Sequence, residues 1–475
     1  MTTLEMEDGT VKGVDEQSLN ENENESTQSS SISSKEAQVD EEKDLENGDD
    51  SQRTNEKLGW ILIAFLLLCD IIGAGVLSMP NAAATLGWFP FFFVNTICWL
   101  FACTAGYLLW RLRMRLREDI HSYPHVMKVV FGPKARMYAN ATVYPILFLY
   151  VAAYCYTQGS SWYEIFKDES SLGLRFWLLI AGLVSILVAQ YRSFEQMALV
   201  SATSLLFIMI PIFISFGVIA EQVTDTLNYP TGPKVLFGSA SFDSSIVAAM
   251  DILYSYGGAV VFLEIMSNMR EIKHFKRALT VSQTTAYTAY CTTGGVIYGL
   301  AGDADWLVSP YVGSLKPGAA KTVAEVLVIV HVALAVIVYA NVLIQGVQRW
   351  VEPFVKRLVH GKLENGKRHP VALLTDGSWK ARGWWLLWSS ITILLATTVN
   401  IVIPSFQVLL GLVASLISSQ TTLIWPGVLD LGYFFKKRVG KEHILSTIST
   451  IAIIVGSAAL VLGLYGDVAN IVKGS

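Results

Sequence analysis

The sequence has few charged residues. Only 16% of its 475 residues are Asp, Glu, Lys or Arg, whereas ordinary soluble proteins carry about 25%. The 35 basic and 39 acidic side chains nearly cancel to a net charge of −4, so the chain lacks the strong positive charge of a general nucleic-acid binder. This composition excludes an ordinary soluble domain, and we expect no nucleic-acid partner.

Cysteine is also scarce. The five cysteines are Cys69, Cys98, Cys103, Cys155 and Cys291, and all lie inside long apolar segments rather than in polar loops. This placement excludes a framework of extracellular disulfides. We expect these side chains to pack as small apolar groups.

Catalytic and metal-binding constellations are missing as well. Residues 361–367 nearly spell a phosphate-binding P-loop, but Arg368 replaces the hydroxyl residue that the motif requires and no strand precedes it. His121 and His125 are four residues apart, yet Pro124 lies between them and no second histidine pair follows. We therefore expect no enzyme activity, no resident metal and no organic cofactor.

The first 57 residues contain no aromatic side chain and very few branched apolar ones. They carry 17 acidic and five basic groups, a net charge of −12, and cannot offset the entropy cost of ordering. We predict a disordered acidic tail over residues 1–57. No apolar stretch follows Met1, so we expect no cleaved signal peptide, and we expect the Asn24 glycosylation sequon to be unused.

The rest of the chain is built from long apolar segments. From Leu58 onward they run for about 20 residues each, enough to cross roughly 30 Å of hydrocarbon as helices. We count eleven: 58–79, 88–110, 138–159, 174–191, 196–220, 246–268, 279–300, 321–346, 384–403, 405–425 and 445–466. They lack the period-two alternation of barrel strands. We predict an all-α polytopic membrane domain over residues 58–466, followed by a short C-terminal tail, 467–475.

The basic residues of this membrane domain predict its orientation. If the acidic tail is cytosolic, 24 of the 30 basic residues after position 57 fall in the five predicted inner loops. The other six are Lys167, Arg175, Lys234, Lys316, Lys321 and Lys473. Because Lys and Arg concentrate in cytoplasmic loops, we expect a cytosolic N-terminus and, after an odd number of spans, a C-terminus outside.

Glycines interrupt the middle of two apolar segments. Gly73 and Gly75 divide the first segment, and Gly257 and Gly258 divide the sixth. Glycine weakens a helix, although close helix packing at small residues would account for either pair alone. Segments one and six are corresponding members of two five-helix halves. Such paired breaks indicate a transporter site at the midplane of the bilayer.

The backbone at such breaks has its own chemistry. Free amides at the start of the second half-helix favour a carboxylate, and free carbonyls at the end of the first half-helix favour an ammonium group or a cation. A zwitterionic amino acid presents both groups on one carbon. The backbone therefore indicates a free amino acid as the ligand.

Few ionisable residues lie within the apolar segments. Asp70 sits one turn before the first glycine break, without an obvious basic neighbour, and is either a proton carrier or a carboxylate held by loose backbone. His331 is a second coupling candidate, with packing as the alternative. Glu264, towards the inner end of segment six, is a third, although a structural or gating bond suits it better. Asp251, near the outer end of that segment, is expected to face water.

The third segment is rich in tyrosine. Tyr150 and Tyr154 are four residues apart and share a helix face, and Tyr144 and Tyr156 lie nearby. Interior packing is the default interpretation of this face, and a pocket wall is the alternative.

Around both glycine breaks the sequence resembles a known family. Residues 71–80, IIGAGVLSMP, are similar to the first-span signature of the amino acid/auxin permease family, and residues 254–266, YSYGGAVVFLEIM, resemble its sixth span. Residues 269–279 resemble the inner loop that follows. Family members commonly have a proline where Leu263 stands. The likeness covers most of residues 58–466 and is strongest to fungal neutral amino acid permeases.

This resemblance implies a LeuT-like fold of two inverted five-helix repeats, with helices 1 and 6 broken, plus one extra helix. The residues implied to bind an amino acid are Gly73, Ala74 and Gly75 for its carboxylate, Ser255 and Tyr256 for its amine, and Gly257 and Gly258 for its side chain. The paired glycines favour bulky apolar side chains. Together these features predict a proton-coupled symporter of neutral aliphatic or aromatic amino acids, working by alternating access.

Other interpretations stay open at this point. Sodium coupling, a vacuolar rather than a plasma membrane location, and an amino acid sensor built on the same fold are all compatible with the pattern. The preferred amino acid and the oligomeric state are not determined by the sequence.

Overall fold

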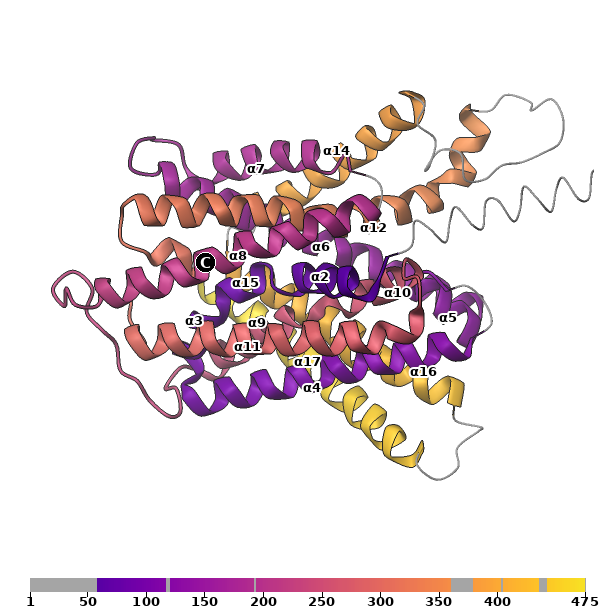
Figure 1. Cartoon of the computed structure of the whole chain (residues 1–475), viewed down its shortest axis with the longest axis horizontal. Helices are drawn as coiled ribbons and strands as arrows, with labels where there is room; N and C mark the ends of the chain where they lie inside the picture. The colour runs from indigo at the N-terminus through magenta and orange to yellow at the C-terminus, as the bar shows by residue number, and fades with distance from the viewer. Residues whose placement is uncertain are drawn as a thin grey trace, which may run out of the picture. The chain divides into compact units, whose positions relative to one another are not determined.

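The computed structural model describes residues 58–116, 120–191, 194–359, 379–402, 405–434 and 442–474. The predicted acidic tail and the near-match to a P-loop at residues 361–367 lie outside these described residues. The described chain is helical, and loops join the helices, of which residues 223–241 form a long one (Figure 1). Its one described bridge of strand type is a parallel contact between Leu58 and Met269.

The structure describes the following helical elements, given in their order along the chain. Their bounds are α2 (Trp60–Ile71), η1 (Ala74–Ser78), α3 (Met79–Leu86), α4 (Trp88–Arg115), α5 (Tyr123–Phe131), α6 (Pro133–Phe166), α7 (Leu174–Val188), α8 (Phe194–Gln222), α9 (Phe242–Ser255), η2 (Gly257–Val261), α10 (Phe262–Ser267), η3 (Ile272–His274), α11 (Phe275–Ala301), η4 (Tyr311–Ser314), α12 (Ala319–Val359), α14 (Trp379–Val402), α15 (Phe406–Val413), η5 (Ala414–Ile424), α16 (Trp425–Phe434) and α17 (Glu442–Gly474).

Each of the eleven predicted apolar segments coincides with a helix or with a broken helix of this series. Nine helices among the described residues are long and apolar enough to cross a membrane. The two others are α7, which is apolar but has 15 residues, and α11, whose many threonines and glycines lower its hydropathy. The prediction of an all-helical membrane protein is confirmed.

Two helical features differ from the expectation. Helix α17 runs on to Gly474, so the last span continues through residues that the sequence assigned to a C-terminal tail. The tenth segment contains a π-helical stretch, η5, which no pattern in the sequence predicted.

Glycines with positive φ end two of the spans. Gly87 (φ 79°) follows α3, and Gly302 (φ 68°) follows α11. L side chains rarely adopt such angles, and a Cβ on Gly302 would also overlap the carbonyl oxygen of Gly232. Both glycines let the chain turn sharply at a helix end.

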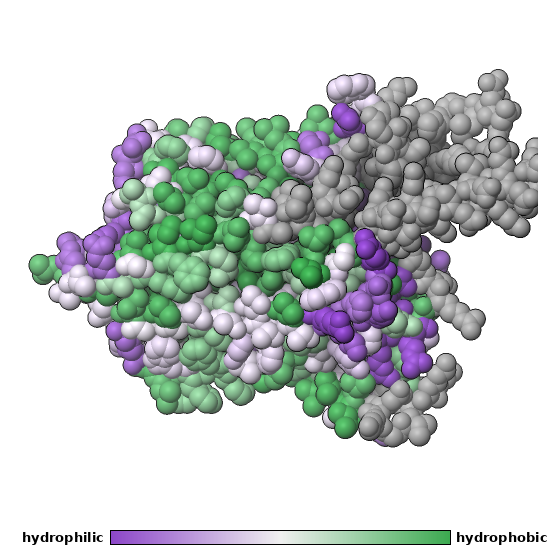
Figure 2. Space-filling view, in the orientation of Figure 1, coloured by the Kyte–Doolittle hydropathy of each residue, from purple (hydrophilic) through white to green (hydrophobic). Residues whose placement is uncertain are grey.

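The outside of the bundle is apolar. Exposed apolar side chains of the outer helices include Leu187 (72% exposed), Phe213 (65%) and Ile454 (63%), and polar residues gather towards the two ends of the bundle (Figure 2). A soluble protein seldom exposes so wide an apolar surface. This belt is the surface expected of a protein embedded in lipid.

Helix α17 packs along η5 and α9 but is largely exposed, so it belongs to the outside of the bundle. The inner layer contains α12, which packs along α6 and α8. The two broken segments lie within this layer, since almost every described residue of α2, η1, α9, η2 and α10 near the breaks is buried.

Candidate functional site at the two helix breaks

The two glycine-containing segments are broken where the sequence predicts. Helix α2 ends at Ile71, and Gly73 adopts φ −122° and ψ −131° before η1 begins at Ala74. In the sixth segment α9 ends at Ser255, Tyr256 leaves the helical conformation, and η2 begins at Gly257. In each segment the helix therefore stops and restarts inside the bundle, and the first amides of the new helix lack intrahelical partners.

The two breaks lie against each other and share one hydrogen-bond donor. The Tyr290 hydroxyl of α11 lies 2.5 Å from the carbonyl oxygen of Ile71 and 2.9 Å from that of Ser255, and donates to both. A Cβ on Gly75 would overlap the Ser255 side chain. The Ile71 carbonyl also accepts from the Gly73 amide at 2.9 Å. A phenol carries a single proton, so the Tyr290 hydroxyl cannot serve both break carbonyls fully at once.

Asp70 reaches from the first segment to the sixth. A Cβ on Gly258 would lie 2.6 Å from its Oδ2 atom, and the Tyr339 hydroxyl of α12 is beside its carboxyl group. Neither carboxyl oxygen makes a hydrogen bond of regular geometry, and the side chain is only 4% exposed. Among the described residues no basic side chain pairs with it.

Four tyrosines form a stacked wall beside Asp70. The ring of Tyr150 stacks on those of Tyr339 (4.6 Å between centroids) and Tyr254 (5.3 Å). The Tyr154 hydroxyl donates to the Asp70 backbone carbonyl at 3.2 Å. The tyrosine face of the third segment therefore lies against the breaks, and its side chains are buried there.

Protein side chains fill the space beside the glycines. A Cβ on Gly257 would overlap the Tyr150 hydroxyl and lie 2.5 Å from Ser418 Oγ, and a Cβ on Gly73 would lie 2.6 Å from the Tyr154 hydroxyl. The room that we expected for a substrate side chain is thus occupied in this conformation. A bound side chain at Gly257 would have to displace Tyr150.

His331 connects the first break to a neighbouring helix. Its Nδ1 atom lies 3.0 Å from both the hydroxyl and the backbone carbonyl of Ser204 on α8. Its ring also faces the backbone of Ile72 in the first break, although Nε2 has no hydrogen bond of regular geometry. The fully buried imidazole therefore touches the break rather than packing away from it.

The other two carboxylates of the sixth segment lie away from the breaks. Glu264 is in α10, is 9% exposed, and interacts electrostatically with Tyr123. Asp251, which we expected to face water, is only 1% exposed. That expectation is wrong because α17 packs against α9, a contact between segments that are distant in sequence.

Sequence reasoning missed Tyr290, Tyr339 and Ser418. No motif surrounds these residues, and each reaches the breaks only because its helix packs there. A tyrosine in the middle of a membrane-spanning segment, where its hydroxyl needs a partner, is the one signal that could have indicated the first two.

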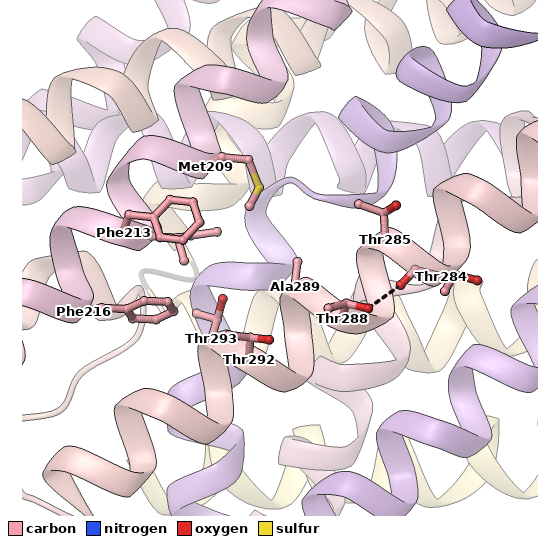
Figure 3. A pocket seen from close by; sticks show the side chains of 10 residues that line it. Met209, Phe213, Phe216, Thr284, Thr285, Thr288, Ala289, Thr292 and Thr293 are labelled. Carbon is pink, nitrogen blue, oxygen red and sulfur yellow. Dashed lines mark hydrogen bonds between the residues drawn. The ribbon is translucent and has the colours of Figure 1, made fainter.

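A separate groove lies between α8 and α11. Its volume is about 330 Å³, and aromatic side chains such as Phe213 and Phe216 face a row of threonines across it (Figure 3). Thr288 already donates to the Thr284 carbonyl at 2.9 Å. With Phe213 65% exposed, this groove belongs to the apolar outer wall and not to the breaks.

Comparisons with known proteins agree with this arrangement. The profile of the family described as transmembrane amino acid transporter protein matches residues 56–468. An N amino acid transport system protein of Neurospora crassa is 22% identical over 430 residues, which cover 87% of this chain and 85% of that one. Amino acid permease 8 of Arabidopsis thaliana is 23% identical, with 90% and 94% covered.

A solved structure supports the fold. A Na+-coupled sialic acid symporter superposes with a TM-score of 0.50 at 13% identity, over 88% of this chain and 92% of the other. This match confirms the predicted LeuT-like fold class. Since the family profile spans nearly all of the described residues, the chain belongs to the family of transmembrane amino acid transporter proteins and is a transporter rather than an enzyme.

Proposed function

We propose that the protein is a proton-coupled symporter of neutral amino acids that binds its substrate between the two breaks and works by alternating access. The observation that carries this proposal is the meeting of the two breaks at Tyr290, whose buried hydroxyl faces a backbone carbonyl of each segment. Such a point suits a small zwitterion.

The substrate carboxylate would take the backbone amides of Gly73, Ala74 and Gly75, at the start of η1. The ammonium group would take the place of the Tyr290 hydroxyl at the carbonyls of Ile71 and Ser255. The Gly73 amide, which now donates to the Ile71 carbonyl at 2.9 Å, would turn to the substrate carboxylate. Tyr256 is anchored by a 2.7 Å hydrogen bond from its hydroxyl to Asn95 Oδ1, so its backbone can hold the second break in place.

The substrate side chain would lie over Gly257 and Gly258 after Tyr150 moves aside. The groups that surround this place are the hydroxyls of Tyr150 and Ser418 and the Asp70 carboxyl group. Asp70 is protonated in the loaded state of this proposal, so no charge remains to attract a cationic side chain. Neutral amino acids, aliphatic or aromatic, therefore fit best.

Asp70 and His331 are the coupling residues in this proposal. Asp70 touches both broken segments, so the charge on its carboxyl group acts directly on how the segments pack. His331 touches the first break from α12. Glu264 lies further along α10, where a gating bond suits its position better than proton transfer.

The proposed orientation places the N-terminus in the cytosol and the C-terminus outside, since most basic residues then lie on the cytosolic side. In this orientation the α5 and α10 ends of the bundle are inner, and the α3 end is outer. We propose the plasma membrane as the location.

The test is uptake of a panel of labelled neutral, cationic and acidic amino acids by cells that express a tagged form, at two external pH values. We expect neutral amino acids to enter faster at the lower pH, and replacement of sodium by choline to change little. Uptake that requires sodium would contradict proton coupling. Binding without net flux would indicate a sensor instead.

A further inference from the structure

Two carboxylates outside the breaks are buried on helices that pack together, α9 and α17. Asp251 of α9 is 1% exposed and Asp467 of α17 is 0% exposed, and the two groups interact electrostatically. The Ser415 hydroxyl of η5 lies 2.8 Å from Asp467 Oδ2. Both oxygens of Asp251 and Oδ1 of Asp467 have no hydrogen-bond partner among the described residues.

No base accompanies this pair in the described part of the chain. The segments α3, η1, η2, α15 and η5, which pack on α9 or α17, contain no Asp, Glu, His, Lys or Arg. On α9 the titratable groups beside the pair are Tyr254, one turn from Asp251, and Asp243, two turns away. On α17 they are Tyr465, two residues before Asp467, and Lys473, further along the helix.

More distant charges are engaged elsewhere. Asp430 of α16 pairs with Arg111 of α4 at 3.3 Å, and the other arginines of α4, Arg113 and Arg115, also follow its apolar part. Two adjacent ionised carboxylates without a counter-ion are strongly unfavourable in an apolar interior. The pair therefore requires a cation, and a proton bound to one of the two carboxylates is the simplest one.

A polar cavity of about 320 Å³ lies next to the pair. Its polar lining includes Asn81, Thr85, Ser244, Gln407 and Asn470. Asp251 is one helical turn from its lining residues Val247 and Ala248, and Asp467 is one turn from Asn470. Water in this cavity can bring protons to the carboxylates.

The pair also lies on the way to the breaks. Ser255, one turn further along α9, donates to the Asp251 backbone carbonyl at 2.9 Å and packs on Gly75. From the start of α9 to its end, the chain therefore passes first the cavity, then the carboxylate pair and then the break. In the proposed orientation the cavity is at the outer end of the bundle.

We propose that Asp251 and Asp467 form a proton-loading site, which takes one proton from water of the outer cavity onto one of its two carboxyl groups. Proton binding forms one O–H bond on the pair and leaves water behind, and release reverses the step. The site sets the external pH range over which transport responds. This inference rests on the proposed proton coupling.

The experiment uses the full-length protein in proteoliposomes that contain a trapped pH dye. Alanine, as a small neutral substrate, is added outside, and both labelled alanine uptake and proton entry are recorded over a range of external pH. Asp251→Asn and Asp467→Asn keep the side-chain shape, and each removes one of the two carboxyl groups that can hold the proton. The control is Asp305→Asn, which changes an exposed loop carboxylate.

We expect each pair variant to move the external-pH midpoint of uptake by about one unit or more, so that proton entry and alanine uptake fall together at an external pH near the wild-type midpoint. Alanine–alanine exchange at low pH should stay within about twofold of the wild type, as the breaks are intact. The control should match the wild type. Exchange also shows that each variant is folded, and Asp467→Glu, which keeps a titratable group, should retain proton entry.

The outcomes separate this inference from the proposed function. If the wild type carries protons with alanine and both Asn variants keep its pH midpoint, the loading site is wrong while the proposed function stands. If the wild type takes up alanine without proton entry, the proposed coupling fails and the loading site fails with it. If the Asn variants instead lose a dependence on sodium, the pair binds sodium and the proposal is overturned.

Discussion

The bundle contains two kinds of buried carboxylate without a basic partner. Asp70 is single, touches both broken segments and is surrounded by tyrosine hydroxyls. Asp251 and Asp467 form a pair near a polar cavity, and the Ser415 hydroxyl donates a hydrogen bond to Asp467. The same chemical group can therefore serve two purposes, because Asp70 can respond to the substrate and the pair can respond to the water outside.

The largest effect is expected from closing the midplane site. Gly257→Val should abolish uptake at every pH, because the added side chain overlaps the Tyr150 hydroxyl and crowds Ser418. Gly217→Val is the matched control, since nothing lies within 4 Å of a Cβ there. Labelled alanine uptake, normalised to membrane protein level, measures both. Full activity of Gly257→Val would contradict a binding site beside this glycine.

Asp70→Asn should have the next largest effect and should separate the two carboxylate regions. Concentrative uptake is expected to fall by about tenfold or more and to lose its response to pH and to a protonophore, whereas exchange survives. The pair variants should instead shift the pH midpoint and keep a response. Uptake in Asp70→Asn that follows pH as in the wild type would exclude Asp70 as a proton carrier.

Tyr290→Phe should affect substrate affinity and leave the pH midpoint unchanged. Loss of the hydroxyl that joins the two break carbonyls should cost about 1 kcal/mol, or about fivefold in KM. Tyr287→Phe on the same helix is the control, because its hydroxyl contacts Thr96 at 3.0 Å instead. Kinetics at several alanine concentrations give KM, and a wild-type KM would show that Tyr290 does not order the site.

The smallest effect is expected from Ser204→Ala. His331 Nδ1 loses one of two oxygen neighbours on α8 and keeps the Ser204 carbonyl, so uptake should fall by only about twofold. Thr288→Ala in the α8–α11 groove is the control and should be silent (Figure 3). A loss as large as that of Asp70→Asn would move the main coupling role to His331.

The sequence predicted the fold through its most local signals. Long apolar segments indicate where helices cross the membrane, and glycine pairs within them indicate where a helix is broken. The breaks at Gly73 and Gly257 were therefore predictable. The burial of Asp251 was not, because it depends on the packing of α17 against α9. Nor was Tyr290, whose role comes from the position of α11 between two breaks.

The limits of prediction are similar at the glycines themselves. Small residues at 257 and 258 suggest space, but whether that space is open depends on which side chains reach it. Tyr150, Ser418 and Asp70 come from three other segments. Only the tertiary arrangement shows that they fill it.

The most direct test of the central claim is the flux of protons and alanine measured together in sodium-free proteoliposomes, for the wild type and for Asp70→Asn. We predict that an inward proton gradient makes the wild type accumulate alanine, that a protonophore stops this, and that Asp70→Asn exchanges alanine without moving protons. Alanine accumulation that needs sodium, or proton-coupled accumulation that persists in Asp70→Asn, would contradict the account.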